Sequence, residues 1–123
     1  TVLLAWNDTR EAARALASAL PMLARARCVH VATGRAVPDA PAGEPAARAV
    51  AAYLRTHGIL AVETHPDVPD QDAGSALLSM AADVGADLLV MGCHGRRPAL
   101  EWVLGGATHT VLDAMTLPVW MAH

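Results

Sequence analysis

The sequence contains no lysine, so arginine side chains carry all of its fixed positive charge. Without an ammonium side chain, Schiff-base chemistry, lysine-assisted serine catalysis and a lysine-dependent phosphate loop are excluded. A phosphorylatable receiver domain is excluded as well, because its chemistry needs a lysine near the fifth strand. The nine arginines are scattered, and the net charge is −3. We therefore expect no nucleic-acid partner, since such partners are held by clustered basic residues.

Cysteine is scarce too. Cys28 and Cys93 are too few for a disulfide framework and form no Cys-x-x-Cys pair, so we expect reduced thiols in a reducing compartment. Long hydrophobic runs are also missing, because charged residues, glycine or proline interrupt each one well short of the ~18 residues of a membrane span. No basic region precedes a hydrophobic signal segment. These absences predict a cytoplasmic protein with no membrane partner.

The 123 residues have the size of one domain, and 54% of them are apolar, which suffices for a single core. Short apolar runs alternate with helical patterns, as in consecutive βαβ units around a parallel sheet. We predict an α/β fold with an open five-stranded parallel sheet and helices on both faces. The expected strands are residues 2–6, 28–32, 59–64, 88–91 and 119–122. In the third, Glu63 and Thr64 favour an edge position, whereas the others are nearly all apolar.

The first predicted helix begins at Asp8 or Thr9, where Asp8 and Glu11 have the spacing of a capping box. Pro21 is expected to kink this helix, because it cannot donate a hydrogen bond to the preceding turn. The predicted buried stripe is Ala13, Leu16, Leu20 and Leu23.

Three further helices follow from local start and stop signals. The second runs from about residue 45 to Gly58, the third from Asp72 to Gly85, and the fourth from about Gly105 to Met115. Residues 34–43 form a loop before the second helix. The predicted inward-facing residues are Ala46, Val50 and Leu54 in the second helix and Ala73, Leu77, Ala81 and Val84 in the third.

Ligands bind to open α/β sheets at the carboxyl ends of the strands, where residues 5–8, 31–34 and 91–97 are expected. In the last segment, Gly92, Gly95 and Gly105 have the spacing G-x2-G-x9-G, and Gly106 follows. Gly92 and Gly95 allow a close backbone approach, while Gly105 and Gly106 open a helix whose free amides attract an anion. The pattern indicates a phosphate-binding site. The alternative is that each glycine only ends a strand or caps a helix.

This glycine pattern, preceded by Met91 and followed by a last strand after Pro118, resembles the nucleotide-binding motif of the universal stress protein family. Residues 4–9 resemble that family's first strand and turn, and residues 29–31 its second strand, so the resemblance covers essentially the whole chain. Three segments in the right order are more specific than a lone glycine pattern. The resemblance implies an adenine-nucleotide alpha-hydrolase-like fold with strand order 3-2-1-4-5. It also implies a stress-response protein that binds ATP, ADP or AMP.

The resemblance further implies roles for particular residues. Ala5 and Asn7 would lie beside adenine and ribose, Val31 would offer backbone groups to the adenine edge, and Met91 would line the pocket floor. The residues implied around the phosphates are Gly92, Gly95, Gly105, Gly106 and Ala107. His94 would line the pocket, and Arg96 or Arg97 would add phosphate contacts unless they are solvated surface charges.

Two positions depart from the family pattern. Asn7 stands where nucleotide-binding members carry aspartate, and Gly106 where they carry serine or threonine. A hydrogen bond to a charged group contributes ~1.5–3 kcal/mol, so losing one weakens binding roughly tenfold to 150-fold. We therefore expect weak nucleotide binding. The alternative is a nucleotide-independent dimeric interaction module whose pocket has decayed.

Catalytic groups are not evident. No residue is an obvious general base for attack on a phosphate, so we expect binding, with at most very slow ATP hydrolysis assisted by Mg²⁺ that arrives with the nucleotide. An enzyme that uses Cys93 or His94 as its reactive group ranks last, because neither has a positioned partner. Cys93, His94 and His109 lack metal-ligand spacing, so we expect no metal site.

The last predicted strand, residues 119–122, has no charge, bulge or internal proline to discourage pairing with another chain. We expect a homodimer in which the last strands pair across a two-fold axis, as the resemblance also implies. The alternative is that Pro118 and the segment around Trp102 protect this edge.

Overall fold

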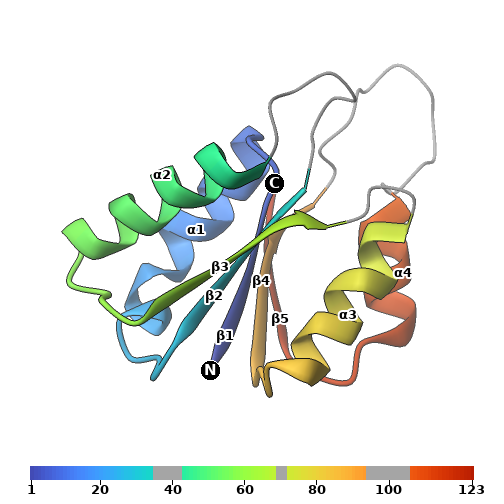
Figure 1. Cartoon of the computed structure of the whole chain (residues 1–123). Coiled ribbons are helices and arrows are strands. Elements are labelled where there is room, and N and C mark those ends of the chain that lie inside the picture. The colour runs from blue at the N-terminus through green and yellow to red at the C-terminus, as the bar shows by residue number, and fades with distance from the viewer. Residues whose placement is uncertain (35–42, 69–71, 94–105) are drawn as a thin grey trace.

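The computed structural model describes residues 1–34, 43–68, 72–93 and 106–123. Five strands form one sheet in the order β3-β2-β1-β4-β5, and every neighbouring pair is parallel (Figure 1). This arrangement confirms the predicted α/β fold and its strand order. In chain order the elements are β1 (Val2–Trp6), α1 (Arg10–Leu23), β2 (Val29–Gly34), α2 (Gly43–Thr56), β3 (Val62–Val68), α3 (Ala73–Asp83), β4 (Leu88–Gly92), α4 (Gly106–Ala114) and β5 (Val119–Ala122).

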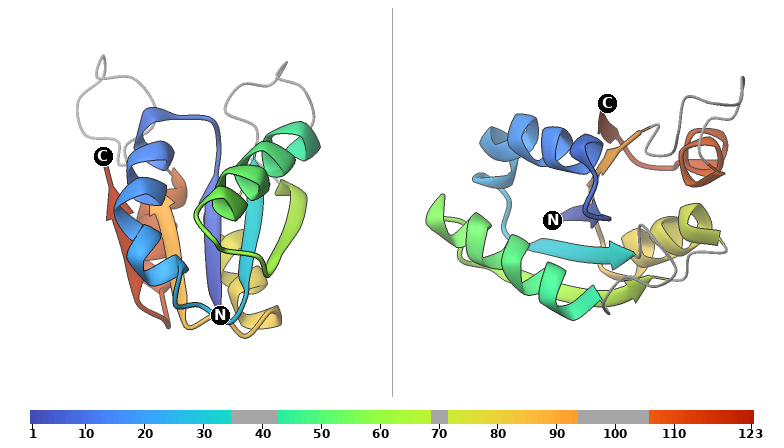
Figure 2. Two further views of the ribbon diagram at one scale, coloured as in Figure 1. Left: turned by 90° about the vertical axis from the view of Figure 1, so that its left-hand side faces the viewer. Right: turned by 90° about the horizontal axis from the view of Figure 1, so that it is seen from above.

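Two hydrophobic layers lie on opposite faces of the sheet. α1 and α2 cover one face, and α3 and α4 cover the other (Figures 1 and 2). Successive strand residues point to opposite faces, so Leu4 of β1 packs in the layer with α1 and α2 while Leu3 packs in the layer with α3 and α4. Both leucines are fully buried. Burial on both sides explains why the inner strands are almost wholly apolar.

The start of α1 differs from the predicted capping box. Thr9 is the N-cap, and its Oγ1 accepts a hydrogen bond from the Ala12 amide at 3.2 Å. Asp8 lies one residue too early and has a φ of 56°, and its carboxylate accepts a hydrogen bond from the Trp6 indole at 3.0 Å. Asp8 therefore stabilises the turn before the helix and does not cap it.

The buried face of α1 is also rotated from the predicted stripe. Leu16 and Leu23 are buried as expected and Leu20 is half-buried, but Ala13 is exposed. The helix continues through Pro21 to Leu23. The buried residues that the prediction omitted are Ala12, Ala15 and Ala19. Small alanine side chains on this face let the helix lie close to the sheet.

The other helix boundaries agree well with the local signals. The Asp72 carboxylate caps α3 by accepting the Ser75 amide at 3.4 Å, as predicted. Gly58 and Gly85 have positive φ values of 78° and 61° after α2 and α3, which is the conformation that makes glycine favourable at a helix end.

Some helix details differ from the predictions. α2 begins at Gly43, so residue 43 belongs to the helix and not to the preceding loop. Ala46 and Ala73 are half-buried, and the fully buried positions beside them are Ala47 and Gly74. α1 and α2 have 14 residues each, and none of the described helices is long and apolar enough to cross a membrane.

β3 starts three residues later than predicted. Ile59 is buried, but its amide donates to the Leu54 carbonyl at the end of α2, so it belongs to the helix terminus. Leu60 is 75% exposed, and the ladder with β2 begins only at Val62. The edge position that Glu63 suggested is confirmed.

Gly74 sits where α3 packs against α4. A Cβ atom at this position would lie 2.5 Å from the Cβ of Thr110 and 2.9 Å from the Ala107 carbonyl oxygen. Contacts this short are not tolerated, so the residue here has to be glycine for the two helices to approach as they do.

We predict that Gly74→Ala lowers the free energy of unfolding by about 1–3 kcal/mol, because the two helices must separate to admit the methyl group. Urea unfolding measures the effect. Gly106→Ala is the matched control, since it adds a methyl group at the start of α4, and no atom of residues 1–34, 43–68, 72–93 or 106–123 restricts it within 4 Å. That control is expected to be neutral, or stabilising by up to about 1 kcal/mol. Equal stabilities for the two variants would contradict the packing argument.

Candidate functional site

The carboxyl ends of all five strands meet at one edge of the sheet, because every pair is parallel. The helices run back along the sheet, so α1 and α4 both begin at this edge (Figure 1). The site residues that the structure places at this edge are Ala5, Asn7, Gly92, Gly106 and Ala107. The predicted residues His94, Gly95, Arg96 and Gly105, as well as Arg97 and Trp102, lie outside the described residues.

The turn after β1 holds Asn7 at the surface. Asn7 is exposed, and its Oδ1 accepts a hydrogen bond from the Thr9 hydroxyl at 2.7 Å. Thr9 Oγ1 also accepts the Ala12 amide, so the Asn7 side chain is tied to the N-cap of α1. One lone pair of the Asn7 oxygen is therefore already used within the turn. Ala5, two residues before it, is half-buried at the end of β1.

Gly92 lies where β4 meets the first turn of α1. A Cβ atom on Gly92 would be 2.5 Å from the Ala12 nitrogen and 2.6 Å from the Glu11 carbonyl carbon. Both of these are backbone atoms that cannot move aside. Glycine is therefore required at this position by the packing of α1, whether or not a ligand binds nearby.

α4 begins at Gly106, which is exposed. Among the residues that the structure describes, no atom lies within 4 Å of a Cβ added to Gly106. No acidic residue lies in the first turn of α4. The Gly106 carbonyl accepts a hydrogen bond from the Thr110 hydroxyl at 3.0 Å. The first amides of any helix have no acceptor within that helix, and α4 begins at this edge (Figure 1). These amides and the helix dipole give the terminus a partial positive charge that favours an anion.

Two residues with predicted roles in the pocket, Val31 and Met91, have buried side chains. The Val31 side chain is fully buried between the sheet and the helices α1 and α2, and β2 continues past it to Gly34. Met91 packs between the sheet and the helices α3 and α4, where it is 4% exposed. Strand alternation sends these two side chains into the two cores. β2 therefore ends two residues later than the predicted residue 32. The backbone role of Val31 and the position of Met91 at the pocket floor stay predictions.

Cys93 follows β4 and is buried. Its amide donates to the Ala122 carbonyl at 2.9 Å, which extends the pairing of β4 with β5 by one residue. Burial raises the pKa of the Cys93 thiol above its usual value, the backbone hydrogen bond opposes this shift, and the negative charge of Glu11 adds to it. A raised pKa means less thiolate at neutral pH, so Cys93 is a poor nucleophile. This weakens the reading of the chain as a Cys93-dependent enzyme.

A group of three side chains on β2 and β3 was not predicted from the sequence. His30 Nδ1 lies 3.0 Å from His65 Nε2 and 3.5 Å from a carboxylate oxygen of Glu63. Burial lowers the pKa of His30, and the Glu63 carboxylate opposes that shift. Glu63 and His65 are two residues apart on a strand, so their side chains project from the same face. This spacing is the feature of the sequence from which a pair of potential metal ligands could have been predicted.

Comparison with known proteins establishes the relationship. The family model described as the universal stress protein family matches residues 1–123. The chain belongs to the universal stress protein family. No curated protein matches the sequence significantly. The resemblance inferred from the three strand-end segments is therefore confirmed for the whole chain.

Solved structures of universal stress proteins share the fold. A universal stress protein from Archaeoglobus fulgidus is 20% identical with a TM-score of 0.75, and the match covers 99% of this chain and 97% of that one. A universal stress protein in complex with cAMP is 24% identical with a TM-score of 0.72, covering 99% and 94%. UspA from Lactobacillus plantarum is 16% identical with a TM-score of 0.71, covering 99% and 96%. At these identities the likeness shows the adenine-nucleotide alpha-hydrolase-like fold.

We predict that iodoacetamide alkylates Cys93 more slowly than the half-buried Cys28 in the folded protein, because Cys93 is less exposed and its pKa is raised. Peptide mapping over a time course separates the two sites. The rate at Cys93 should continue to rise at a pH where an ordinary thiol is already ionised. Equal or faster reaction at Cys93 near neutral pH would instead identify it as an activated thiol.

Proposed function

We propose that this universal stress protein is a stress-response protein that binds an adenine nucleotide weakly at the carboxyl ends of β1 and β4. The observation that carries the proposal is the N-terminus of α4, which is exposed at Gly106, has no acidic residue in its first turn and lies at the same edge of the sheet as Asn7. Such a terminus suits a phosphate, and an exposed amide side chain suits a ribose hydroxyl. The family member crystallised with cAMP adds support from a related chain.

The proposed role is binding and not rapid turnover. Two groups at this edge that the structure describes are unsuited to activate water, since the Cys93 thiol is buried with a raised pKa and Asn7 is a neutral amide. Neither can serve as a general base for water at neutral pH. Any Mg²⁺ would come with the nucleotide. A cytoplasmic setting is consistent with the two free cysteines.

A second candidate is an interaction module that no longer uses a nucleotide. Asn7 supports it, because its oxygen is already bonded to Thr9 and it carries no charge for a ribose. The burial of Met91 supports it as well, because this residue is only 4% exposed and packs in the core with α3 and α4. The two candidates make opposite predictions for ATP binding.

We predict that ATP binds to the wild-type protein weakly and that the double variant Asn7→Asp, Gly106→Ser binds it roughly tenfold to 150-fold more tightly. The carboxylate would accept ribose hydroxyls with a full charge while still accepting from Thr9. The described part of the chain leaves room for the serine at position 106, because none of its atoms lies within 4 Å of a Cβ there. Isothermal titration calorimetry with ATP measures both affinities.

Leu60→Asp is the matched control for the added charge. Leu60 is 75% exposed and precedes β3, at the end of the sheet where the strands begin. The Leu60→Asp variant should therefore bind ATP with the affinity of the wild type. Absence of heat at millimolar ATP for both the wild type and the double variant would favour the interaction module. Unchanged affinity in the double variant would refute the role given to positions 7 and 106.

We further propose that the protein forms a homodimer through β5. β5 is an edge strand, and it carries only apolar side chains. Its Trp120 indole donates to Ser18 on α1 at 2.9 Å, which anchors the strand to its own subunit. An apolar, charge-free edge is a template for pairing with another chain. No partner class other than a second copy follows from this edge.

The peptide groups that would pair across the dimer can be assigned. The carbonyls of Pro118 and Ala122 accept hydrogen bonds from Leu89 and Cys93 and so point toward β4. Alternation within a parallel ladder then turns the peptide groups of Val119 and Met121 away from β4. A proline at position 121 removes one outward N–H and leaves the bonds to β4 intact.

We predict that Met121→Pro shifts the wild-type dimer toward monomer, whereas Met121→Ala remains dimeric. The alanine variant is matched because it also removes the methionine side chain from the core but keeps the outward N–H. Light scattering at micromolar protein concentration measures the molar mass of each variant in solution. A wild-type mass of one chain, or a dimer that persists equally in Met121→Pro, would contradict pairing through β5.

A further inference from the structure

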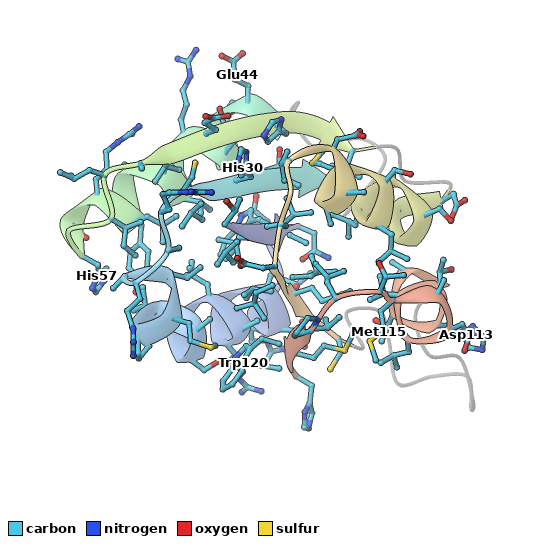
Figure 3. All side chains as sticks on the ribbon, turned by 90° about the horizontal axis from the view of Figure 1, so that it is seen from below. His30, Glu44, His57, Asp113, Met115 and Trp120 are labelled. Carbon is cyan, nitrogen blue, oxygen red and sulfur yellow. The ribbon has the colours of Figure 1, made fainter. Side chains whose placement is uncertain are left out.

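His30, Glu63 and His65 form a cluster on the face of the sheet that α3 and α4 cover in part. His30 pairs in register with Glu63, and Ala32 pairs with His65, so the three side chains come from two adjacent parallel strands. His30 lies on β2 beside the edge strand β3 (Figure 3). Because Glu63 and His65 are two residues apart, they project from the same face of β3.

The ligand atoms of this cluster converge. One nitrogen of each histidine and one oxygen of Glu63 all lie within 4.8 Å of one another. His30 Nδ1 is 3.0 Å from His65 Nε2 and 3.5 Å from Glu63 Oε2. Ligand atoms that share a tetrahedral zinc with bonds of ~2.0–2.1 Å lie roughly 3.3 Å apart. The two distances bracket that separation, so small side-chain rotations would bring the three atoms onto one ion.

The cluster lies where the hydrophobic core meets the solvent, which is a suitable environment for a metal site. His30 is 8% exposed, and its register neighbour on β1 is the fully buried Leu3. Glu63 has a side chain that is 65% exposed, and His65 is half-buried. The nitrogens are thus partly shielded from water while the carboxylate faces solvent. This arrangement gives an ion an entry path and leaves a further coordination position for water.

We propose that His30, Glu63 and His65 bind a divalent transition-metal ion, with Zn²⁺ as the preferred ion. Two imidazoles and one carboxylate are a ligand set that zinc accepts with a fourth, open position. The site is separate from the proposed nucleotide site, because His30 and Glu63 are each the second residue of their strands and lie away from the carboxyl-terminal edge. A bound ion would join the edge strand β3 to β2.

A hydrogen bond between two neutral imidazoles is the competing explanation of the 3.0 Å contact. One ring would donate and the other accept, and Glu63 would add a weak ion pair at the surface. This explanation requires no metal and gives Glu63 no essential role. The experiment must therefore measure metal stoichiometry and the contribution of Glu63 together.

We predict that the full chain binds one equivalent of Zn²⁺ in competition with a chromophoric chelator. His65→Gln should weaken binding about a hundredfold and Glu63→Gln about tenfold, because each removes one ligand. Glu63 is exposed, so its substitution should not disturb folding. With Co²⁺ as the probe, the wild type should show the intense visible absorption of a four-coordinate ion, and His65→Gln should lose it.

His109→Gln is the matched control, because His109 is also adjacent to a carboxylate, with its Nδ1 2.9 Å from Asp113 on exposed α4. Its Zn²⁺ affinity should equal that of the wild type. The melting temperature should rise with Zn²⁺ in the wild type and in His109→Gln but not in His65→Gln. Binding that is weaker than micromolar, that is unchanged in His65→Gln or Glu63→Gln, or that is lost in His109→Gln would overturn the proposal.

Discussion

The hydrogen-bonded ladder around β1 is the constraint on which the rest of the structure depends. β1 pairs in parallel with β2 on one side and β4 on the other, so it has no free edge. Its side chains must then be buried on both faces, and the two helical layers supply that burial. Parallel pairing also brings every strand's carboxyl end to one side. The position of the proposed nucleotide site is a consequence of this geometry.

Glycines in this fold serve packing as well as binding. Gly92 lets the first turn of α1 approach β4, and Gly74 lets α3 approach α4. Both positions would be occupied by glycine even in a relative that bound nothing. Gly106 is different, because it lies at a helix start and none of the described residues would contact a Cβ placed on it. Glycine is therefore required at different positions of one motif for different physical reasons. Only a glycine that packing does not require indicates a ligand.

The two edge strands have opposite chemistry. β5 is apolar, so no charge discourages its outer peptide groups from pairing with a second chain. The hydrogen bond from Trp120 to Ser18 holds this strand to α1. β3 carries Glu63 and His65, whose charge and polarity discourage such pairing. The same polar side chains meet His30 across the ladder. Glu63 and His65 thus discourage pairing of β3 with another chain and also contribute to the proposed metal site.

Much of this protein could be predicted from local chemistry. The alternation of apolar runs with helical patterns gave the α/β fold, Asp72 and Gly85 marked the ends of α3, and Glu63 marked an edge strand. These signals act between residues a few positions apart, so they are readable in sequence. The family resemblance supplied the strand order and the segments at the strand ends.

The tertiary structure decided what depends on contacts between distant residues. The burial of Val31 and Met91 in two different cores and the packing requirement at Gly92 arise from neighbours on other elements. The meeting of His30 with His65 follows from the register of β2 and β3. Sequence determines which residues favour strand, helix or turn, because those preferences are local. Register and packing determine which side chains meet, because those contacts are formed only when the whole chain folds.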